Sequence, residues 1–178
     1  KAAAGFILTA SHNPGGPDGD FGLKFNTPSG GQATEQVTEA VFRTSQQLSG
    51  YRIASLPPVD LVRTGNTKCG ELDIQVIDPV ADYAMLMQEL FDFAAIRTWL
   101  QDGHRIRFDA MHGVTGPYAR RILVDLLGCP PDSILHAESL PDFGGLHPDP
   151  NPIDAAELVA ESLRPDSADL LAASDGDG

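Results

Sequence analysis

Residues 9–16 place a hydroxyl, an imidazole and an amide side by side, directly after an apolar run and at the start of a glycine-rich loop. The three side chains belong to Ser11, His12 and Asn13. A serine hydroxyl becomes a useful nucleophile when a base or an electrostatic field assists it, and His12 is adjacent to orient or protonate a transferring oxygen. Backbone N–H groups of the glycine-rich loop that follows can cradle phosphate oxygens. The stretch is therefore a candidate phosphoryl-carrying site, although a serine–histidine pair in a loop is more often plain polar surface.

Lys24 adds a cationic group thirteen residues after Ser11. It stands between two apolar residues in a short strand-like stretch, where an ordinary surface lysine is the simpler interpretation. If it faces a phosphoryl group, its ammonium stabilises the phosphate charge and, once desolvated, can lend or take a proton.

Two carboxylates, Asp175 and Asp177, alternate with glycine at residues 175–178. Glycine leaves the backbone free, so both carboxylates can turn toward one hard cation. A flexible turn is the alternative for so short an acidic segment. An EF-hand is disfavoured, because no helix precedes the loop and the other ligands of that motif do not follow.

Short strands and loops must position the serine and the lysine. Residues 2–8 form a continuous apolar run, typical of a strand buried on both faces of a parallel sheet. Residues 23–26 alternate apolar with polar and predict a second strand. A helix is expected over residues 34–48. Residues 50–73 are rich in turn formers, and we place a domain boundary near residue 73.

From residue 74 onward, strands alternate with helices, which indicates a mostly parallel sheet. The expected strands cover residues 74–77, 105–109, 134–135 and 170–173. The expected helices cover residues 79–90, 93–100, 118–127 and 155–163. Sites in such sheets form where strands end, and Asp109 and Asp175 both lie at or just after a strand end. The predicted fold class is α/β: two α/β domains, the first one partial, with mixed, mostly parallel sheets flanked by helices.

Composition and charge exclude several classes of protein. Hydrophobic residues make up 42% of the chain, enough for a buried core and too many for a disordered segment. The net charge of −13 argues against a nucleic-acid surface, which needs clustered Lys and Arg. No apolar run approaches the roughly 20 residues of a membrane span. Cys69 and Cys129 match no metal or disulfide spacing, so we expect two reduced thiols and a cytoplasmic location.

Two classes of nucleotide-dependent protein are also disfavoured. The tripeptide Asp-Phe-Gly occurs at residues 20–22 and 142–144, but a kinase also needs a His-Arg-Asp catalytic loop and a strand lysine paired to a helix glutamate. No Gly-Lys-Ser/Thr follows any glycine run, so the chain has no P-loop.

Several motifs together resemble the phosphoglucomutase branch of the α-D-phosphohexomutase family. They are Thr-Ala-Ser-His-Asn-Pro-Gly-Gly at residues 9–16, Asp-Phe-Gly-Leu-Lys-Phe-Asn at 20–26, Asp-Ala-Met-His-Gly at 109–113, Asp-Phe-Gly-Gly at 142–145, His-Pro-Asp-Pro-Asn at 147–151 and Asp-Gly-Asp-Gly at 175–178. The resemblance covers essentially the whole chain. It implies that residues 1–73 are the C-terminal part of the family's domain I, with the phosphoserine loop, and that residues 74–178 are domain II, truncated inside the metal-binding loop. The family's domains III and IV have no counterpart, so we expect a fragment that is inactive by itself.

By this resemblance, Ser11 carries the exchanged phosphate, and His12 and Lys24 are further catalytic residues. The implied substrate-binding residues are His12, Asn13 and Lys24. The implied Mg²⁺ ligands are Ser11, Asp175 and Asp177, with a third aspartate of the family beyond the chain end. His112 is expected to be a satisfied loop histidine, and residues 147–151 a rigid loop that shapes the cleft or contacts ligand directly.

The activity implied by the resemblance is the interconversion of glucose 1-phosphate and glucose 6-phosphate. Phosphorylated Ser11 would donate its phosphoryl group to the substrate, and the resulting hexose 1,6-bisphosphate would reorient and return its other phosphate. Two alternatives stay open: a non-catalytic relative with a structural or signalling role, and a phosphohexomutase of different sugar specificity. Retention of the candidate residues favours the enzyme, and the motifs at 20–26 and 109–113 disfavour a phosphomannomutase or phosphoglucosamine mutase. The sequence predicts no oligomeric state.

Overall fold

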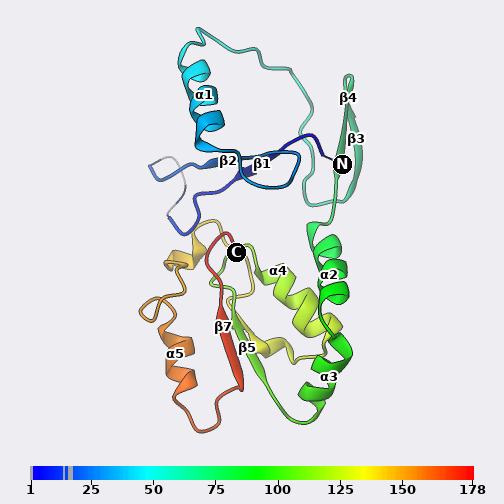
Figure 1. Cartoon of the computed structure of the whole chain (residues 1–178), viewed down its shortest axis with the longest axis vertical. Helices are drawn as coiled ribbons and strands as arrows, with labels where there is room; N and C mark the ends of the chain where they lie inside the picture. The colour runs from blue at the N-terminus through cyan, green and yellow to red at the C-terminus, as the bar shows by residue number, and fades with distance from the viewer. Residues whose placement is uncertain (1, 14, 16–17) are drawn as a thin grey trace. The chain divides into compact units, whose positions relative to one another are not determined.

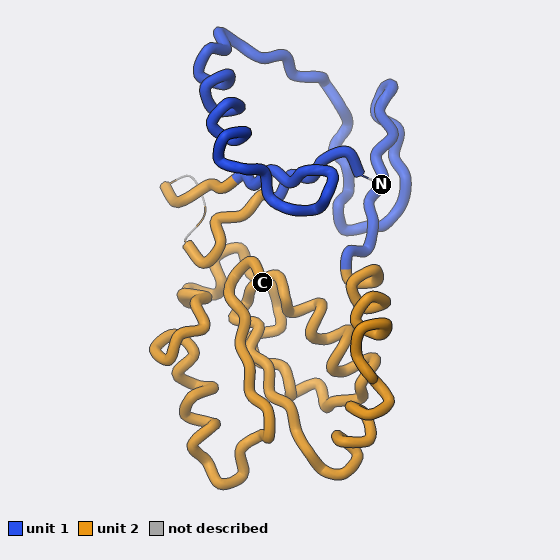
Figure 2. The backbone as a smooth tube through the Cα atoms, viewed as in Figure 1, with its two compact units in different colours: residues 1–7, 23–79 blue, residues 8–22, 80–178 orange. Residues whose placement is uncertain are grey.

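The computed structural model of the chain describes residues 2–13, 15 and 18–178. These residues pack into two compact units. Unit 1 comprises Lys1–Ile7 and Leu23–Pro79, and unit 2 comprises Leu8–Gly22 and Val80–Gly178 (Figure 2). The predicted domain boundary near residue 73 differs from the division between these two units, and the domain assignment stays a prediction.

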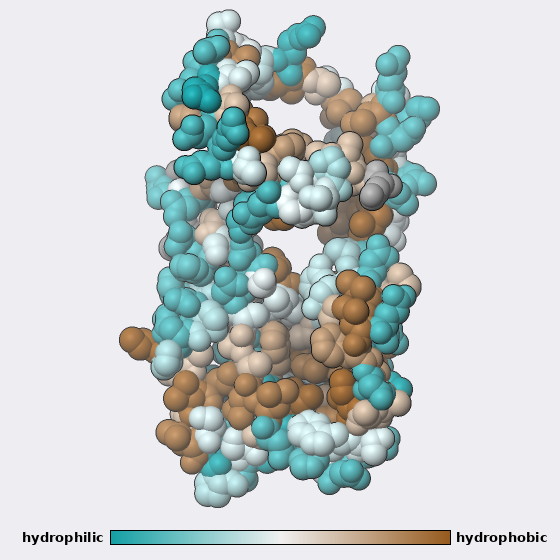
Figure 3. All heavy atoms as spheres, viewed as in Figure 1, coloured by the Kyte–Doolittle hydropathy of each residue, from teal (hydrophilic) through white to brown (hydrophobic). Residues whose placement is uncertain are grey.

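Unit 1 carries two small sheets and a helix. Strand β1 (Gly5–Leu8) pairs with β2 (Leu23–Asn26), the strand predicted over the same residues. Strands β3 (Gly65–Cys69) and β4 (Leu72–Val76) form an antiparallel pair. Helix α1 (Glu35–Gln46) lies within the predicted helix and has no buried residue. Figure 3 shows hydrophilic side chains over most of its visible face.

Two expectations for unit 1 are wrong. Residues 50–73, expected to be irregular, contain β3 and a turn at Gly70, where φ is 64°. The sequence of β3 has no apolar alternation, so its pairing depends on backbone hydrogen bonds that periodicity does not reveal. The strand within residues 2–8 is not buried on both faces. Phe6 and Leu8 are each 68% exposed, because within the described residues this sheet has only β2 as a second strand.

Unit 2 is built on a parallel sheet in the order β6-β5-β7, which confirms the predicted α/β class. The strands are β5 (Ile106–Asp109), β6 (Ile134–Leu135) and β7 (Leu170–Ala173). Phe108 of β5 stands opposite Ile134 of β6 and Ala172 of β7, so the three strands point the same way and end together. The residues that follow β5 and β7 therefore meet at one edge of the sheet.

Helices lie on both sides of this sheet, with α5 on one side of the β5–β7 pair and α3 and α4 on the other (Figure 1). The helices are α2 (Pro79–Leu90), α3 (Phe93–Gln101), α4 (Gly116–Ala119), the π-helical η1 (Arg120–Leu126), α5 (Ala156–Ser162) and the 3₁₀ turns η2 (Pro131–Ser133) and η3 (Phe143–Gly145). The helix predicted over residues 118–127 is thus present, although most of it is wound as a π-helix. Within the described ranges, none of the helices combines the length and the apolar character that crossing a lipid bilayer requires.

The core of unit 2 includes the loops that leave the sheet as well as the sheet itself. Met111, in the loop after β5, and Pro148, in the loop before α5, are the largest fully buried side chains. Ala110 is fully buried beside Met111, and Ile134 of β6 is 7% exposed. Burying loop residues in this way holds the segments at the ends of the strands in fixed positions.

Gly116 lets α4 begin against the backbone of residue 137. A Cβ on Gly116 would lie 1.9 Å from the carbonyl oxygen of Ala137 and 2.7 Å from its carbonyl carbon. Since a backbone cannot swing aside as a side-chain end can, we expect Gly116→Ala to lower the free energy of unfolding by about 3 kcal/mol, measured by urea denaturation. Gly50→Ala is the control, because a Cβ there meets no atom within 4 Å. Equal unfolding midpoints for the two variants would contradict this expectation.

Candidate functional site

Ser11 sits in a tight turn that directly follows β1. Its φ of 57° lies in the left-handed region, which is uncommon for a residue with a side chain. Two hydrogen bonds hold the turn: the N–H of Ser11 donates to Thr9 Oγ1 at 2.9 Å, and the N–H of Asn13 donates to the Ala10 carbonyl at 3.1 Å. Backbone strain of this kind persists where the surroundings enforce it, often at functional sites. Pro14, Gly16 and Pro17, in the predicted phosphate-cradling loop, lie outside the described residues.

Asp177 joins this turn to the other end of the chain, within unit 2. The hydroxyl of Ser11 donates to Asp177 Oδ1 at 3.3 Å, and the hydroxyl of Thr9 donates to Asp177 Oδ2 at 3.1 Å. The carboxylate therefore receives a hydroxyl on each oxygen. Residues 166 positions apart in sequence are brought into hydrogen-bonding contact, as a shared serine–aspartate site requires.

Gly176 makes the close approach of the two segments possible. A Cβ at this position would lie 2.8 Å from the carbonyl oxygen of Ser11 and 3.0 Å from Cζ of Phe143. Asp175, on the other side of the glycine, accepts a hydrogen bond from the N–H of Gly178 at 2.9 Å through Oδ1. Both carboxylates of the Asp-Gly-Asp-Gly segment are thus hydrogen-bonded and half-buried.

The loop that follows β5 supports the aspartate loop from behind. The N–H of Ser174 donates to the Asp109 carbonyl, and the N–H of Val114 donates to the Gly176 carbonyl, both at 3.1 Å. The Asp109 carboxylate is 2% exposed and accepts from the N–H of Met111 and pairs with Nδ1 of His136, at 2.8 Å each. These bonds give the buried carboxyl group hydrogen-bond partners, and the backbone bonds fix the direction in which the aspartate loop leaves β7.

Of the other predicted site residues, His12 and Asn13 lie on the Ser11 turn, whereas Lys24 lies in the other unit. His12 is half-buried beside Ser11, and Asn13 is exposed on the same turn. Lys24 is half-buried in β2 of unit 1, and its part in the site stays a prediction. His112 has a hydrogen-bond partner, as expected of a satisfied loop histidine: its Nδ1 donates to the Glu138 carbonyl oxygen at 2.7 Å.

Sequence reasoning missed Thr9, whose hydroxyl links the Ser11 turn to Asp177. The signal for it was its place in the same motif, two residues before the serine. Sequence reasoning also assigned no partner to residues 147–151. In the structure, the imidazole rings of His147 and His12 are in contact, with centroids 5.2 Å apart.

The donor set at this site suits a hard divalent cation. The hydroxyl of Ser11 and the carboxylates of Asp175 and Asp177 offer oxygen atoms alone, the ligand type that Mg²⁺ prefers. A phosphoryl group on the Ser11 hydroxyl would bring further anionic oxygens to a position that already contacts Asp177, and a cation between them would neutralise the repulsion.

A pocket of about 420 Å³ adjoins the aspartate loop within unit 2. Side chains of Tyr83, Phe108 and Tyr118 line it together with Asp177 and Gly178. Its walls are mainly apolar and aromatic, so it offers few partners for the hydroxyl and phosphate groups of a sugar phosphate. The polar turn at Ser11, rather than this pocket, is the candidate site.

Comparison with protein-family models gives two matches. The model described as phosphoglucomutase/phosphomannomutase α/β/α domain I matches residues 1–52, and that for α/β/α domain II of the same family matches residues 81–178.

Curated relatives match over the full chain. Phosphoglucomutase from Rhizobium radiobacter is 51% identical over 178 residues, chloroplastic phosphoglucomutase from Arabidopsis thaliana 49% over 179, and phosphoglucomutase from Schizosaccharomyces pombe 48% over 180. Each alignment includes 100% of this chain and 33%, 29% and 32% of the respective relative. The chain therefore spans about a third of the length of the curated relatives it matches.

A solved structure of similar fold is that of parafusin from Paramecium, an exocytosis-sensitive phosphoprotein also described as a phosphoglucomutase, in its open form. It is 38% identical, with a TM-score of 0.85. The match covers 98% of this chain and 34% of that structure.

Proposed function

Because the chain belongs to the phosphoglucomutase branch of the phosphoglucomutase/phosphomannomutase family, we propose that the protein interconverts glucose 1-phosphate and glucose 6-phosphate through a phosphorylated Ser11. The observation that carries this proposal is the contact of the Ser11 hydroxyl with Asp177. It unites the serine motif with the acidic loop, the two segments that phosphoryl transfer with a divalent cation needs in one place.

The proposed reaction is two phosphoryl transfers in opposite directions. In the first, the bond between phosphorus and Ser11 Oγ breaks while a free hydroxyl of the hexose phosphate bonds to phosphorus and loses its proton. The hexose 1,6-bisphosphate so formed turns around, and the bond between its other phosphorus and the sugar oxygen breaks while Ser11 Oγ bonds to that phosphorus. The sugar oxygen takes up a proton and leaves as a hydroxyl. His12, next to Ser11, and Lys24 are the groups proposed to handle the proton and to bind phosphate charge, with Asn13 as a further contact to the substrate.

We propose that Ser11, Asp175 and Asp177 hold Mg²⁺ in this reaction. The support is the all-oxygen donor set and the ordered aspartate loop. When bound, the cation supplies charge neutralisation at the transferring phosphoryl group. The carboxylate of Asp177 accepts a hydrogen bond from the Ser11 hydroxyl and so orients that side chain.

We further propose the domain assignment and the cellular location. Residues 1–73 correspond to part of domain I and residues 74–178 to domain II, which the family matches at residues 1–52 and 81–178 support. A cytoplasmic location is supported by two free, buried cysteines, Cys69 and Cys129. Burial raises the pKa of the Cys129 thiol, which keeps it in the unreactive protonated form.

A direct assay tests the proposed function. The protein expressed from its natural gene, activated with glucose 1,6-bisphosphate and Mg²⁺, should convert glucose 1-phosphate to glucose 6-phosphate. Mannose 1-phosphate and glucosamine 1-phosphate serve as comparison substrates, and we expect kcat/KM for the glucose compound to exceed theirs by about 10-fold or more. Faster turnover of either comparison substrate would reassign the sugar, and no turnover of all three would support a non-catalytic role instead.

A further inference from the structure

Two histidines from distant parts of the sequence are in contact beside Ser11. The rings of His12 and His147 have centroids 5.2 Å apart and an interplanar angle of 74°, an edge-to-face arrangement. His12 follows Ser11 directly, whereas His147 belongs to the proline-rich loop that leads to α5. Both residues lie in unit 2.

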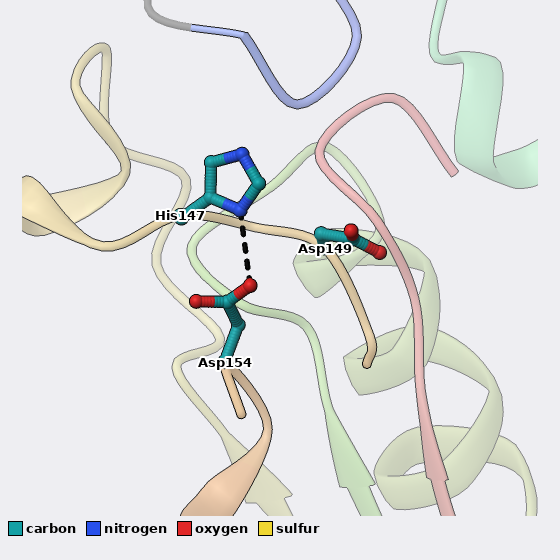
Figure 4. A group of neighbouring side chains, drawn as sticks. All are labelled: His147, Asp149 and Asp154. Carbon is teal, nitrogen blue, oxygen red and sulfur yellow. Dashed lines mark hydrogen bonds and ion pairs between the residues drawn. The ribbon is translucent and has the colours of Figure 1, made fainter. Parts of the chain in front are cut away.

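Asp154 holds the ring of His147. Nδ1 of His147 lies 3.0 Å from Oδ2 of Asp154, the pair joined by the dashed line in Figure 4. Hydrogen bonds from His147 and then Asn151 lower the pKa of the Asp154 carboxyl, so this group is ionised at neutral pH. An ionised carboxylate only accepts hydrogen bonds, and Nδ1 of His147 must therefore carry the hydrogen. The tautomer and the orientation of the ring are both set by this bond.

Asn151 in turn fixes Asp154. Its side-chain oxygen accepts from the N–H groups of Ile153 and Asp154 at 2.8 and 3.0 Å, which orients the amide unambiguously. Its Nδ2 then donates to Oδ2 of Asp154 at 2.6 Å and to Oδ2 of Asp149 at 3.0 Å. The buried Pro148 anchors the same loop. Hydrogen bonds of Asn151 and the burial of Pro148 therefore hold the loop that supports His147.

A metal site is the other chemistry that this cluster suggests. His147, Asp149 and Asp154 each offer a ligand atom, all within 4.8 Å of one another (Figure 4). The amide of Asn151, however, already donates to both carboxylates, and Nδ1 of His147 points its hydrogen at Asp154. Nδ1 of His147 and one oxygen of each carboxylate are thus engaged within the cluster, which is the arrangement of a structural support rather than of a cation site.

We propose that His147, held by Asp154, is a positioning residue that orients the imidazole of His12 for phosphoryl transfer at Ser11. The inference rests on the proposed function. The edge of one ring against the face of the other limits rotation of His12, whose side chain is otherwise only half-buried. A group that assists transfer of a proton or a phosphoryl oxygen acts in a narrow range of orientations, so a freely turning ring would assist less often.

Variants of His147 and Asp154 test this proposal in the protein expressed from its natural gene. We expect His147→Ala and Asp154→Asn to lower kcat about 10-fold while KM changes little, because His147 acts through His12 and not on the substrate. His147→Phe, which keeps an aromatic ring against His12, should recover most of the lost kcat. The matched control is His104→Ala, since His104 Nδ1 lies 3.1 Å from Asp169 Oδ1 in an otherwise similar pair and stacks on Trp99 instead.

Histidine-ring NMR separates this inference from the proposed function. Loss of the neighbouring ring in His147→Ala should shift the ring signals of His12, whether or not the protein turns over sugar phosphates. If the wild-type protein has no mutase activity but His147→Ala still shifts the ring signals of His12, the proposed function is wrong and the contact between the two rings stands. Active protein in which His147→Ala alters neither kcat nor the His12 signals overturns the inference, as does a kcat loss of equal size in His104→Ala.

Discussion

Replacing Ser11 with alanine is expected to lower mutase kcat by about 10⁴-fold or more, because the variant has no oxygen to carry the phosphoryl group. The turn itself should survive, since the bonds that hold it come from the N–H groups of residues 11 and 13. The measurements are the glucose 1-phosphate assay and intact-mass analysis after incubation with glucose 1,6-bisphosphate. Wild-type protein should gain one phosphate, mapped to Ser11 by peptide analysis, and the variant should gain none.

Ser162→Ala is the matched control for that loss. Ser162 lies at the end of α5, where its hydroxyl donates to the Val159 carbonyl at 2.7 Å within the same helix. We expect it to keep wild-type kcat and wild-type phosphate incorporation. Phosphate found on a different residue of active wild-type protein, or full activity of Ser11→Ala, would contradict the assignment of the phosphoryl carrier.

Apolar spacing and helix-start residues predicted most of the helices and strands after residue 74. Helix α2 begins at Pro79 as expected, and β5 and β7 fall within one residue of their predicted bounds. Strand β3 could not be predicted in this way, since it has no alternation of apolar and polar residues and pairs with β4 through a hairpin. The π-helical winding of η1 was also unpredictable, because apolar spacing does not distinguish it from an α-helix over so few residues.

The site was predictable only where it depends on strand ends. Since β5 and β7 are parallel neighbours, the segments after Asp109 and Ala173 had to lie together, and Ser174 does bond to Asp109. That Asp177, rather than Asp175, meets the Ser11 hydroxyl depends on backbone angles within the loop, which residue types do not determine. The contact of His147 with His12 likewise follows from the path of a proline-rich loop, and Asp154 has no spacing signal that marks it as a partner.

The direct contact of Asp177 with Ser11 makes its charge testable by an almost isosteric change. Asp177→Asn keeps one acceptor oxygen but removes the negative charge and replaces the other oxygen with an amide that cannot bind a cation. We expect kcat to fall about 10²- to 10³-fold, as for loss of one electrostatic group at a transition state, and the Mg²⁺ concentration for half-maximal activity to rise. Both are measured in the glucose 1-phosphate assay over a range of Mg²⁺ concentrations.

Two comparison variants decide whether charge or hydrogen bonding carries this effect. Thr9→Val removes the 3.1 Å hydrogen bond to Asp177 Oδ2 but leaves the carboxylate charged, so its Mg²⁺ requirement should stay near that of wild type. Asp125→Asn removes an exposed carboxylate that pairs with Arg121 at 3.5 Å on one helix, and it should change neither kcat nor the Mg²⁺ requirement. If Thr9→Val raises the Mg²⁺ requirement as much as Asp177→Asn does, the carboxylate orients the Ser11 turn and does not bind the cation. If only Asp177→Asn raises it, the negative charge itself is what the cation needs, and the serine–aspartate contact is one half of a metal site that the phosphoryl group completes.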